Sequence, residues 1–166
     1  MKPLKSSSDY VERAGRLVID ANVAIGAILS GHQGRTRHLL QQLATEGVVL
    51  FAPEELLQEV ERHLTYVVTR SLARRHITGN AFIQGQQDAA NIWDEVQTAL
   101  WLVPLREYGF FETAARKRVP ADPDDWPYVA LALRLDCAIL TKNLAHFAGS
   151  GIPIWSLETV GLLLEE

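Results

Sequence analysis

The chain has 166 residues, and 48% of them are hydrophobic, which suits one domain with a buried core and excludes a disordered tail or linker. Its formal net charge of −4 and its sequence pI near 5.7 exclude a strongly basic protein that coats nucleic acid through bulk charge. The single cysteine, Cys137, excludes a disulfide framework and favours a reducing, cytoplasmic location, and no apolar run predicts a membrane span or a secretory signal.

Residues 1–15 are predicted to be a flexible lead-in, because they contain three consecutive serines and no periodic apolar pattern. Residues 16–166 are predicted to form a single domain. Short apolar runs in this part predict strands that are buried on both faces, at 17–19, 48–51, 100–103, 137–140 and 152–155. Apolar periodicity predicts helices at 23–29, 54–66 and 80–99 and from residue 125 onward. This alternation predicts an α/β fold, a three-layer α/β/α sandwich with a central parallel sheet.

A carboxylate and an amide follow the first predicted strand. Asp20 comes directly after residues 17–19, and Asn22 follows two positions later. Ligands of parallel α/β sheets bind outside the carboxyl ends of the strands, so both side chains are candidate site residues. Their oxygen atoms are of the kind that Mg²⁺ or Mn²⁺ takes as ligands. The alternative is that Asp20 or Asn22 only caps the helix that follows.

Glu59 is the second candidate, on the helix predicted at 54–66. At about 100° per residue it falls at the edge of the apolar stripe of that helix, where it can face a cleft. The alternative is an ordinary solvated glutamate. Glu54 and Glu55 need no functional explanation, because acids stabilise the first turn of a helix.

An acidic loop precedes the helix that starts near residue 125. It holds Asp122, Asp124 and Asp125 within four positions. Carboxylates this close repel one another, and a bound divalent cation removes the repulsion. A turn with a helix cap explains one or two of these acids, but it accounts less well for three.

Neutral and basic side chains are predicted to position water or phosphate groups around these acids. Thr141 and Asn143 follow the fourth predicted strand and, like Asn22, suit a metal-bound water or a phosphate better than strong cation binding. Six basic residues are candidate contacts to phosphates of a nucleic acid, with a solvated helix face as the alternative. They are Arg70, Arg74, Arg75, Arg116, Lys117 and Arg118.

Taken together and in this order, the motifs resemble those of the PIN domain family, the small metal-dependent nucleases that include VapC-type toxins. The resemblance is carried by the segments around Asp20 and Glu59, by the acidic loop at 122–125, and by residues 138–143. It extends over about residues 16–163, nearly the whole chain. Each motif is short, but four of them in the correct order and sheet context are fairly specific.

The resemblance implies a PIN-like fold and a catalytic centre. It implies that Asp20, Glu59 and Asp125 bind Mg²⁺ or Mn²⁺, with Asp124 as a further catalytic acid that orients the attacking water or acts as base. The implied reaction is hydrolysis of phosphodiester bonds in RNA, and the implied partners are RNA, an antitoxin protein and a second copy of the chain.

One departure from the family pattern keeps other functions open. The family often has a further acid where this chain has Asn143, and an amide adds no charge, which favours one well-held ion over two. A PIN-like domain that binds RNA or protein without cutting is therefore an alternative. A magnesium-dependent phosphatase or receiver domain is a weaker one, because the phosphatase needs an aspartate where Asn22 stands and neither class explains Glu59.

Overall fold

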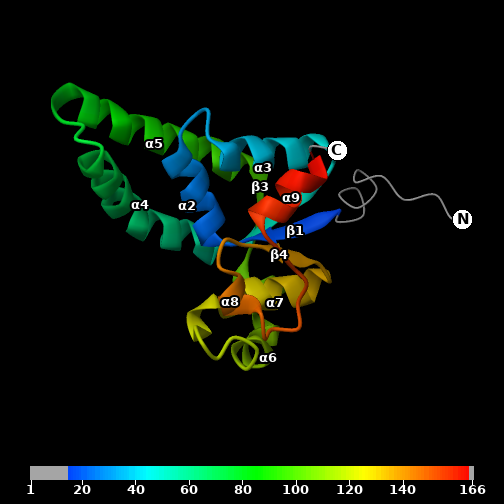
Figure 1. The fold of residues 1–166 in the computed structure, drawn as a ribbon. Helices are drawn as coiled ribbons and strands as arrows, with labels where there is room; N and C mark the ends of the chain where they lie inside the picture. The colour runs from blue at the N-terminus through cyan, green and yellow to red at the C-terminus, as the bar shows by residue number, and fades with distance from the viewer. Residues whose placement is uncertain (1–14, 165–166) are drawn as a thin grey trace, which may run out of the picture.

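Five parallel strands form one sheet in the computed structural model of the chain, which describes residues 15–164 (Figure 1). The lead-in predicted at 1–15 lies, except for Gly15, outside the described residues. The strands are β1 (Arg16–Ile19), β2 (Val49–Pro53), β3 (Leu100–Val103), β4 (Ala138–Leu140) and β5 (Ile154–Trp155). Their order across the sheet is β3-β2-β1-β4-β5, and every pairing is parallel. The predicted central parallel sheet is confirmed.

Helices cover both faces of the sheet, which confirms the three-layer prediction (Figure 1). One layer contains α2 (Ala21–Ser30), α3 (Arg35–Thr45), α4 (Glu55–Arg74), α5 (Gly79–Ala99) and α9 (Leu157–Leu164). The other contains α6 (Glu112–Arg116), α7 (Trp126–Leu135) and α8 (Leu144–Phe147). The 3₁₀ turns are η1 (Leu105–Glu107), η2 (Gly109–Phe111) and η3 (Pro123–Asp125). In the described part of the chain, the helices are too short or too polar to cross a lipid bilayer.

The helical layer around α4 differs from the prediction. α4 continues to Arg74 rather than ending near residue 66, because its buried stripe extends through Val68 and Leu72. It packs against α5, and together they form a two-helix arm that projects past the sheet (Figure 1). α3 and α9 pack on each other and have no counterpart in the sequence prediction.

The sheet reverses its strand order at β1, because β2 and β3 lie on one side of β1 whereas β4 and β5 lie on the other. Ligands of parallel α/β sheets bind at such a position, outside the carboxyl ends of the strands. Ile19 pairs with Leu140, and the Asp20 N–H donates a hydrogen bond to the Leu140 carbonyl at 3.1 Å. The side chains that follow β1 and β4 therefore lie next to each other.

α7 holds the acidic loop against this edge of the sheet. The helix packs on β1, β2 and β4, and every residue from Trp126 to Ala132 is buried. A helix that is apolar all round is a core element, so its first residues are fixed in position. The acids that precede Trp126 are thereby anchored beside the strand ends.

Candidate active site

The carboxylate of Asp20 is held at the junction of β1 and β4. Asp20 is 4% exposed, and its Oδ2 accepts hydrogen bonds from the Thr141 hydroxyl at 2.6 Å and from the Asn22 side-chain amide at 2.5 Å. Asn22 in turn accepts a hydrogen bond from the Lys142 N–H at 2.9 Å. The Asn143 N–H donates to the Thr141 hydroxyl oxygen at 2.9 Å. The structure thus brings together the predicted polar residues that follow β1 and β4.

Helix capping does not explain Asp20 or Asn22. α2 begins at Ala21, so Asn22 lies inside the helix rather than at its cap. Asp20 occupies the N-cap position, but its side chain makes no capping hydrogen bond. Both side chains instead point their polar atoms at each other and at Thr141.

The environment of Asp20 disfavours its charged form. Its pKa is raised from 3.8 to about 7, mainly by burial and further by the carboxylates of Asp125 and Glu59, while the hydrogen bond from Thr141 opposes the shift. Three acidic groups from β1, α4 and the loop before α7 therefore face one another across this edge of the sheet. Their mutual repulsion is relieved by protonation or by a bound cation.

Glu59 reaches this region from α4 and is fixed by α7. The Tyr128 hydroxyl donates a hydrogen bond to Glu59 Oε2 at 2.7 Å, and Tyr128 is 2% exposed. Burial, followed by the negative charge of Glu59, raises the pKa of the Tyr128 hydroxyl, so it remains a donor. Glu59 is half-buried and held by a partner, which is not the situation of an ordinary solvated glutamate.

The acids of the loop before α7 differ in their environments. Asp122 caps η3, because its side chain accepts a hydrogen bond from the Asp124 N–H at 3.3 Å. Asp125 makes no capping bond to α7, and its Oδ2 lies 3.0 Å from Nδ1 of His146. Burial raises the pKa of Asp125, the His146 contact lowers it, and the charges of Asp122 and Glu59 raise it further. Asp124 is exposed. Capping therefore accounts for Asp122 but not for Asp125.

A pocket of about 460 Å³ lies between α4 and the acidic loop. Carboxylates dominate its lining, and the basic residues in the lining are Arg62 and His63 of α4. The carboxylates are Glu55, Glu59, Asp122, Asp124 and Asp125. An acidic pocket with an arginine and a histidine on one wall can hold metal ions and contact a phosphate chain.

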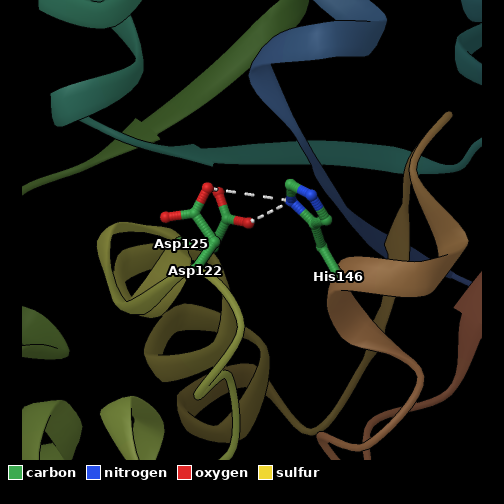
Figure 2. Close-up of side chains that lie close together, drawn as sticks. All are labelled: Asp122, Asp125 and His146. Carbon is green, nitrogen blue, oxygen red and sulfur yellow. Dashed lines mark hydrogen bonds and ion pairs between the residues drawn. The ribbon is translucent and has the colours of Figure 1, made fainter.

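Glu55 and His146 are among the residues of this region that are absent from the site predicted from the sequence. Glu55 is an acceptor for the hydroxyl of buried Tyr108 and lines the acidic pocket, although its place in the first turn of α4 also explains it. His146 lies in α8, and its imidazole faces Asp122 and Asp125 (Figure 2). Its one sequence signal is its position shortly after β4, at the same edge of the sheet as Asp20.

The side chains able to bind a metal come closest together between the acidic loop and α8. Within residues 15–164, Asp122, Asp125 and His146 form one group of three whose ligand atoms all lie within 4.8 Å of one another (Figure 2). Asp20 and Glu59 do not belong to that group. The carboxylates of Asp20, Glu59 and Asp125 are close enough for their charges to interact. They are farther apart than the ligand atoms of the group formed by Asp122, Asp125 and His146.

Three basic residues predicted to contact nucleic acid lie in the distal half of α4 and directly after it. Arg70, Arg74 and Arg75 are exposed. The Arg70 guanidinium lies 5.9 Å from the centre of the Tyr66 ring and donates a hydrogen bond to the Tyr66 hydroxyl at 2.9 Å. The distal part of α4 therefore carries exposed arginines and an exposed aromatic ring.

The second basic cluster, residues 116–118, is partly engaged by the fold. Arg116 donates hydrogen bonds to Glu112 and to the Pro123 carbonyl, and its guanidinium lies 5.2 Å from the Trp126 ring. Arg118 donates to the Ser150 carbonyl at 2.7 Å. Lys117 is exposed between them. Arg116 thus braces the loop that carries the acids, whereas Arg118 contacts the segment that follows α8.

Comparison with known proteins identifies the family. A sequence model of the PIN domain family matches residues 18–165. The chain belongs to the PIN domain family. Among solved structures, the PIN domain described here is similar to "Crystal structure of VapBC2 from Rickettsia felis bound to a DNA fragment from their promoter". That match has a TM-score of 0.57 and 13% sequence identity, and it covers 85% of this chain and 98% of the other. A search of curated protein sequences gave no match.

Family membership confirms the resemblance inferred from the motifs and gives the reaction class. PIN domains are nucleases, which generally use a divalent metal ion, so at the level of the family this chain is a nuclease-type hydrolase. The fold similarity to the VapBC2 structure supports the three-layer architecture. The phosphatase and receiver alternatives are not supported, because those proteins belong to other families.

Proposed function

We propose that this PIN domain is a divalent-cation-dependent endoribonuclease with Asp20, Glu59 and Asp125 as its metal ligands. The observation that supports this most strongly is the buried carboxylate of Asp20, whose pKa is raised to about 7 by burial and by two facing carboxylates. Burying such a group costs free energy of folding unless its charge is compensated. A cation bound to Asp20 would compensate the charge of the buried carboxylate and offset this free-energy cost.

The donor set suits Mg²⁺ or Mn²⁺. Both ions take carboxylate oxygens as ligands and retain several waters. Thr141 and Asn22 hold Asp20 by two hydrogen bonds, and Tyr128 holds Glu59 by one, so two of the proposed ligands are already oriented. With Asn143 contributing no charge at this edge, we propose one well-held ion at this ligand set.

The proposed mechanism assigns distinct tasks to the side chains. Asp20, Glu59 and Asp125 would hold a divalent cation, which would supply a water of lowered pKa and positive charge beside the phosphate oxygens. Asp124, exposed in the pocket wall, is proposed to orient the attacking water or to accept its proton. Asn22, Thr141 and Tyr128 act as positioning residues, because each holds a proposed ligand.

RNA is the proposed substrate. Arg62 and His63 in the pocket wall, and Arg70 and Arg74 farther along α4, are proposed to contact RNA phosphates on the way to the acids. Arg75, which directly follows α4, is proposed as a further contact. Tyr66 is 61% exposed beneath Arg70, where an unpaired base can stack on it. Lys117 and the engaged Arg116 and Arg118 are proposed as secondary contacts.

Cleavage of labelled single-stranded RNA and DNA, in Mg²⁺, Mn²⁺ or EDTA, tests this proposal. Wild-type protein is expected to cut RNA only with metal, and Asp20→Asn is expected to lose about 100-fold or more of that activity. Asp94→Asn, which changes an exposed aspartate of α5, is the matched control and should cut like wild type. Equal cleavage by Asp20→Asn contradicts the site. Metal binding without any cleavage by wild type favours the non-cutting RNA- or protein-binding domain instead.

The likeness to VapBC2 also supports a proposed role as the toxin of a toxin–antitoxin pair, with a small antitoxin protein and a second copy of the chain as partners. The arm is the proposed antitoxin contact, because Ile83 on α5 is 66% exposed there.

Expression of the wild type in bacteria should arrest growth, while Asp20→Asn should not. Co-expression of a small protein encoded beside the chain should relieve the arrest and co-purify with it. Light scattering of the purified chain tests the dimer.

A further inference from the structure

Asp122, Asp125 and His146 form a cluster beside the proposed catalytic ligands and share Asp125 with them. Asp122 and Asp125 lie at the two ends of the acidic loop turn, and His146 comes from α8, which follows β4 (Figure 2). The proposed nuclease mechanism uses neither Asp122 nor His146. Capping of η3 uses Oδ1 of Asp122 and does not explain why its Oδ2 faces His146.

The distances in the cluster are close to those around a bound transition-metal ion. His146 Nδ1 lies 3.0 Å from Asp125 Oδ2 and 3.8 Å from Asp122 Oδ2. Ligand atoms that sit about 2.1 Å from a zinc or manganese ion lie roughly 3–3.5 Å from each other. All the ligand atoms lie within 4.8 Å of one another, so the Asp122 side chain must close toward the other two for three ligands to surround one ion.

The surrounding fold orients these side chains and leaves them accessible. Asp122 is held by the Asp124 N–H, and the residue after His146, Phe147, is fully buried and anchors α8. The side chains are 43%, 16% and 38% exposed for Asp122, Asp125 and His146, respectively. An ion can therefore enter from solvent, and open coordination positions remain for water or phosphate oxygen.

The imidazole nitrogen sets the metal preference. Mg²⁺ and Ca²⁺ are bound almost entirely by oxygen, whereas Mn²⁺, Co²⁺ and Zn²⁺ accept imidazole together with carboxylate ligands. We propose that Asp122, Asp125 and His146 form a second cation site that takes a transition-metal dication in preference to Mg²⁺. The site depends on the proposed function only through Asp125, and it makes that residue a ligand shared between two ions.

Metal binding to the full chain without a histidine tag tests the site. After EDTA treatment and dialysis, calorimetric titration with Mn²⁺ should give one ion more for the wild type than for His146→Phe. Asp122→Asn, which retains the ability to cap η3, should weaken the same binding event by about tenfold or more. His38→Phe removes an exposed imidazole of α3 and should bind as wild type does. Melting curves without metal establish that each variant is folded.

Two further titrations separate this site from its alternatives. Co²⁺ added to the wild type should produce visible absorption bands that shift in His146→Phe, because one nitrogen ligand is lost. Asp20→Asn should retain the His146-dependent binding event even if cleavage is lost, so a failure of the proposed catalytic site does not count against this one. If wild type and His146→Phe bind Mn²⁺ with the same stoichiometry and affinity, His146 is only an ion-pair partner of Asp125, and the proposal is wrong.

Discussion

Two buried tyrosines hold glutamates of α4 by the same kind of contact. The Tyr128 hydroxyl donates to Glu59, and the Tyr108 hydroxyl donates to Glu55, one helical turn earlier. Both tyrosines are almost completely buried. Glu59 belongs to the proposed metal ligands whereas Glu55 does not, so the pair offers a controlled comparison between positioning a ligand and bracing the fold.

Replacing Tyr128 with phenylalanine is expected to weaken metal binding. The ring stays buried, but Glu59 loses the donor that holds it, so the affinity for Mn²⁺ should fall by about tenfold. The loss in the free energy of unfolding should be only ~1.5–3 kcal/mol, as expected for a hydrogen bond to a charged group. Calorimetric titration with Mn²⁺ and urea denaturation measure the two effects.

Tyr108→Phe is the control for that substitution. It removes an equivalent hydrogen bond, to Glu55, and should therefore lower the free energy of unfolding by a similar amount without changing the metal affinity. If both variants lose metal affinity equally, the effect of Tyr128 is a general loosening of α4 and not the orientation of Glu59.

The sequence is informative about candidate residues whose position follows from a local pattern. Asp20 ends a buried apolar run, Glu59 lies at the edge of a helical stripe, and Asp125 precedes an apolar helix. His146 and Glu55 could not be found in this way, because their partners lie 21 and 53 residues away along the chain. Those contacts arise only when α8 packs beside β5 and the η1–η2 segment packs against α7.

The secondary-structure elements also differ in how well a local sequence pattern predicts them. The short apolar runs predict β1 to β4 well, because strands buried on both faces are continuous in hydrophobicity. In the arm, α5 is predicted almost in full, at 80–99 against Gly79–Ala99, whereas α4 is predicted to end near residue 66 and continues to Arg74. The two helices approach closely where Gly85 faces Leu72, and a Cβ atom at Gly85 would lie 2.7 Å from a Leu72 methyl carbon. That close packing depends on both helices at once and has no signal in either one alone.

The charge on the arm leads to a prediction about α4. Arg74 ends the helix and Arg75 follows it, and both are exposed. If they contact RNA phosphates, changing both to glutamine should weaken binding of single-stranded RNA to a catalytically inactive Asp20→Asn background. The slope of log affinity against log salt should decrease by about 0.7 for each lost phosphate contact.

Arg106→Gln with Arg134→Gln is the matched control, because these two arginines are exposed but lie on η1 and at the end of α7. It removes the same net charge from other elements. Fluorescence anisotropy at several salt concentrations should show wild-type binding for this control. Equal losses in both double variants would mean that the net charge of the molecule, and not the arm, determines RNA affinity.

At the scale of the whole molecule, the strand order assembles the site from segments that are far apart in the sequence. Asp20 follows β1, Glu59 comes from the helix after β2, and Asp125 precedes the helix before β4. The reversal of strand order at β1 brings these three segments to one edge of the sheet. The fold therefore concentrates negative charge, and its stability becomes linked to pH and to metal.

The sign of that linkage follows from the raised pKa of Asp20. The folded protein binds the Asp20 proton more tightly than the unfolded chain, with a pKa of about 7 against 3.8. The resulting stabilisation is fully present below pH 3.8 and is lost as pH rises through about 7. In EDTA, the free energy of unfolding of wild type relative to Asp20→Asn should fall by about 2–4 kcal/mol between pH 4 and pH 8. Urea denaturation of both proteins across this range measures the difference.

A divalent cation should reverse the trend, because the metal competes with the proton for the same carboxylates. With saturating Mn²⁺, wild type should become more stable relative to Asp20→Asn as pH rises from 5 to 8, since the ionised carboxylate is the form that binds the ion. Asp94→Asn should follow wild type with and without metal. If the stability difference between wild type and Asp20→Asn does not depend on pH in EDTA, Asp20 is not the strongly perturbed acid at the centre of this site. If the dependence in EDTA is present but Mn²⁺ does not reverse it, the buried carboxylate is not a metal ligand.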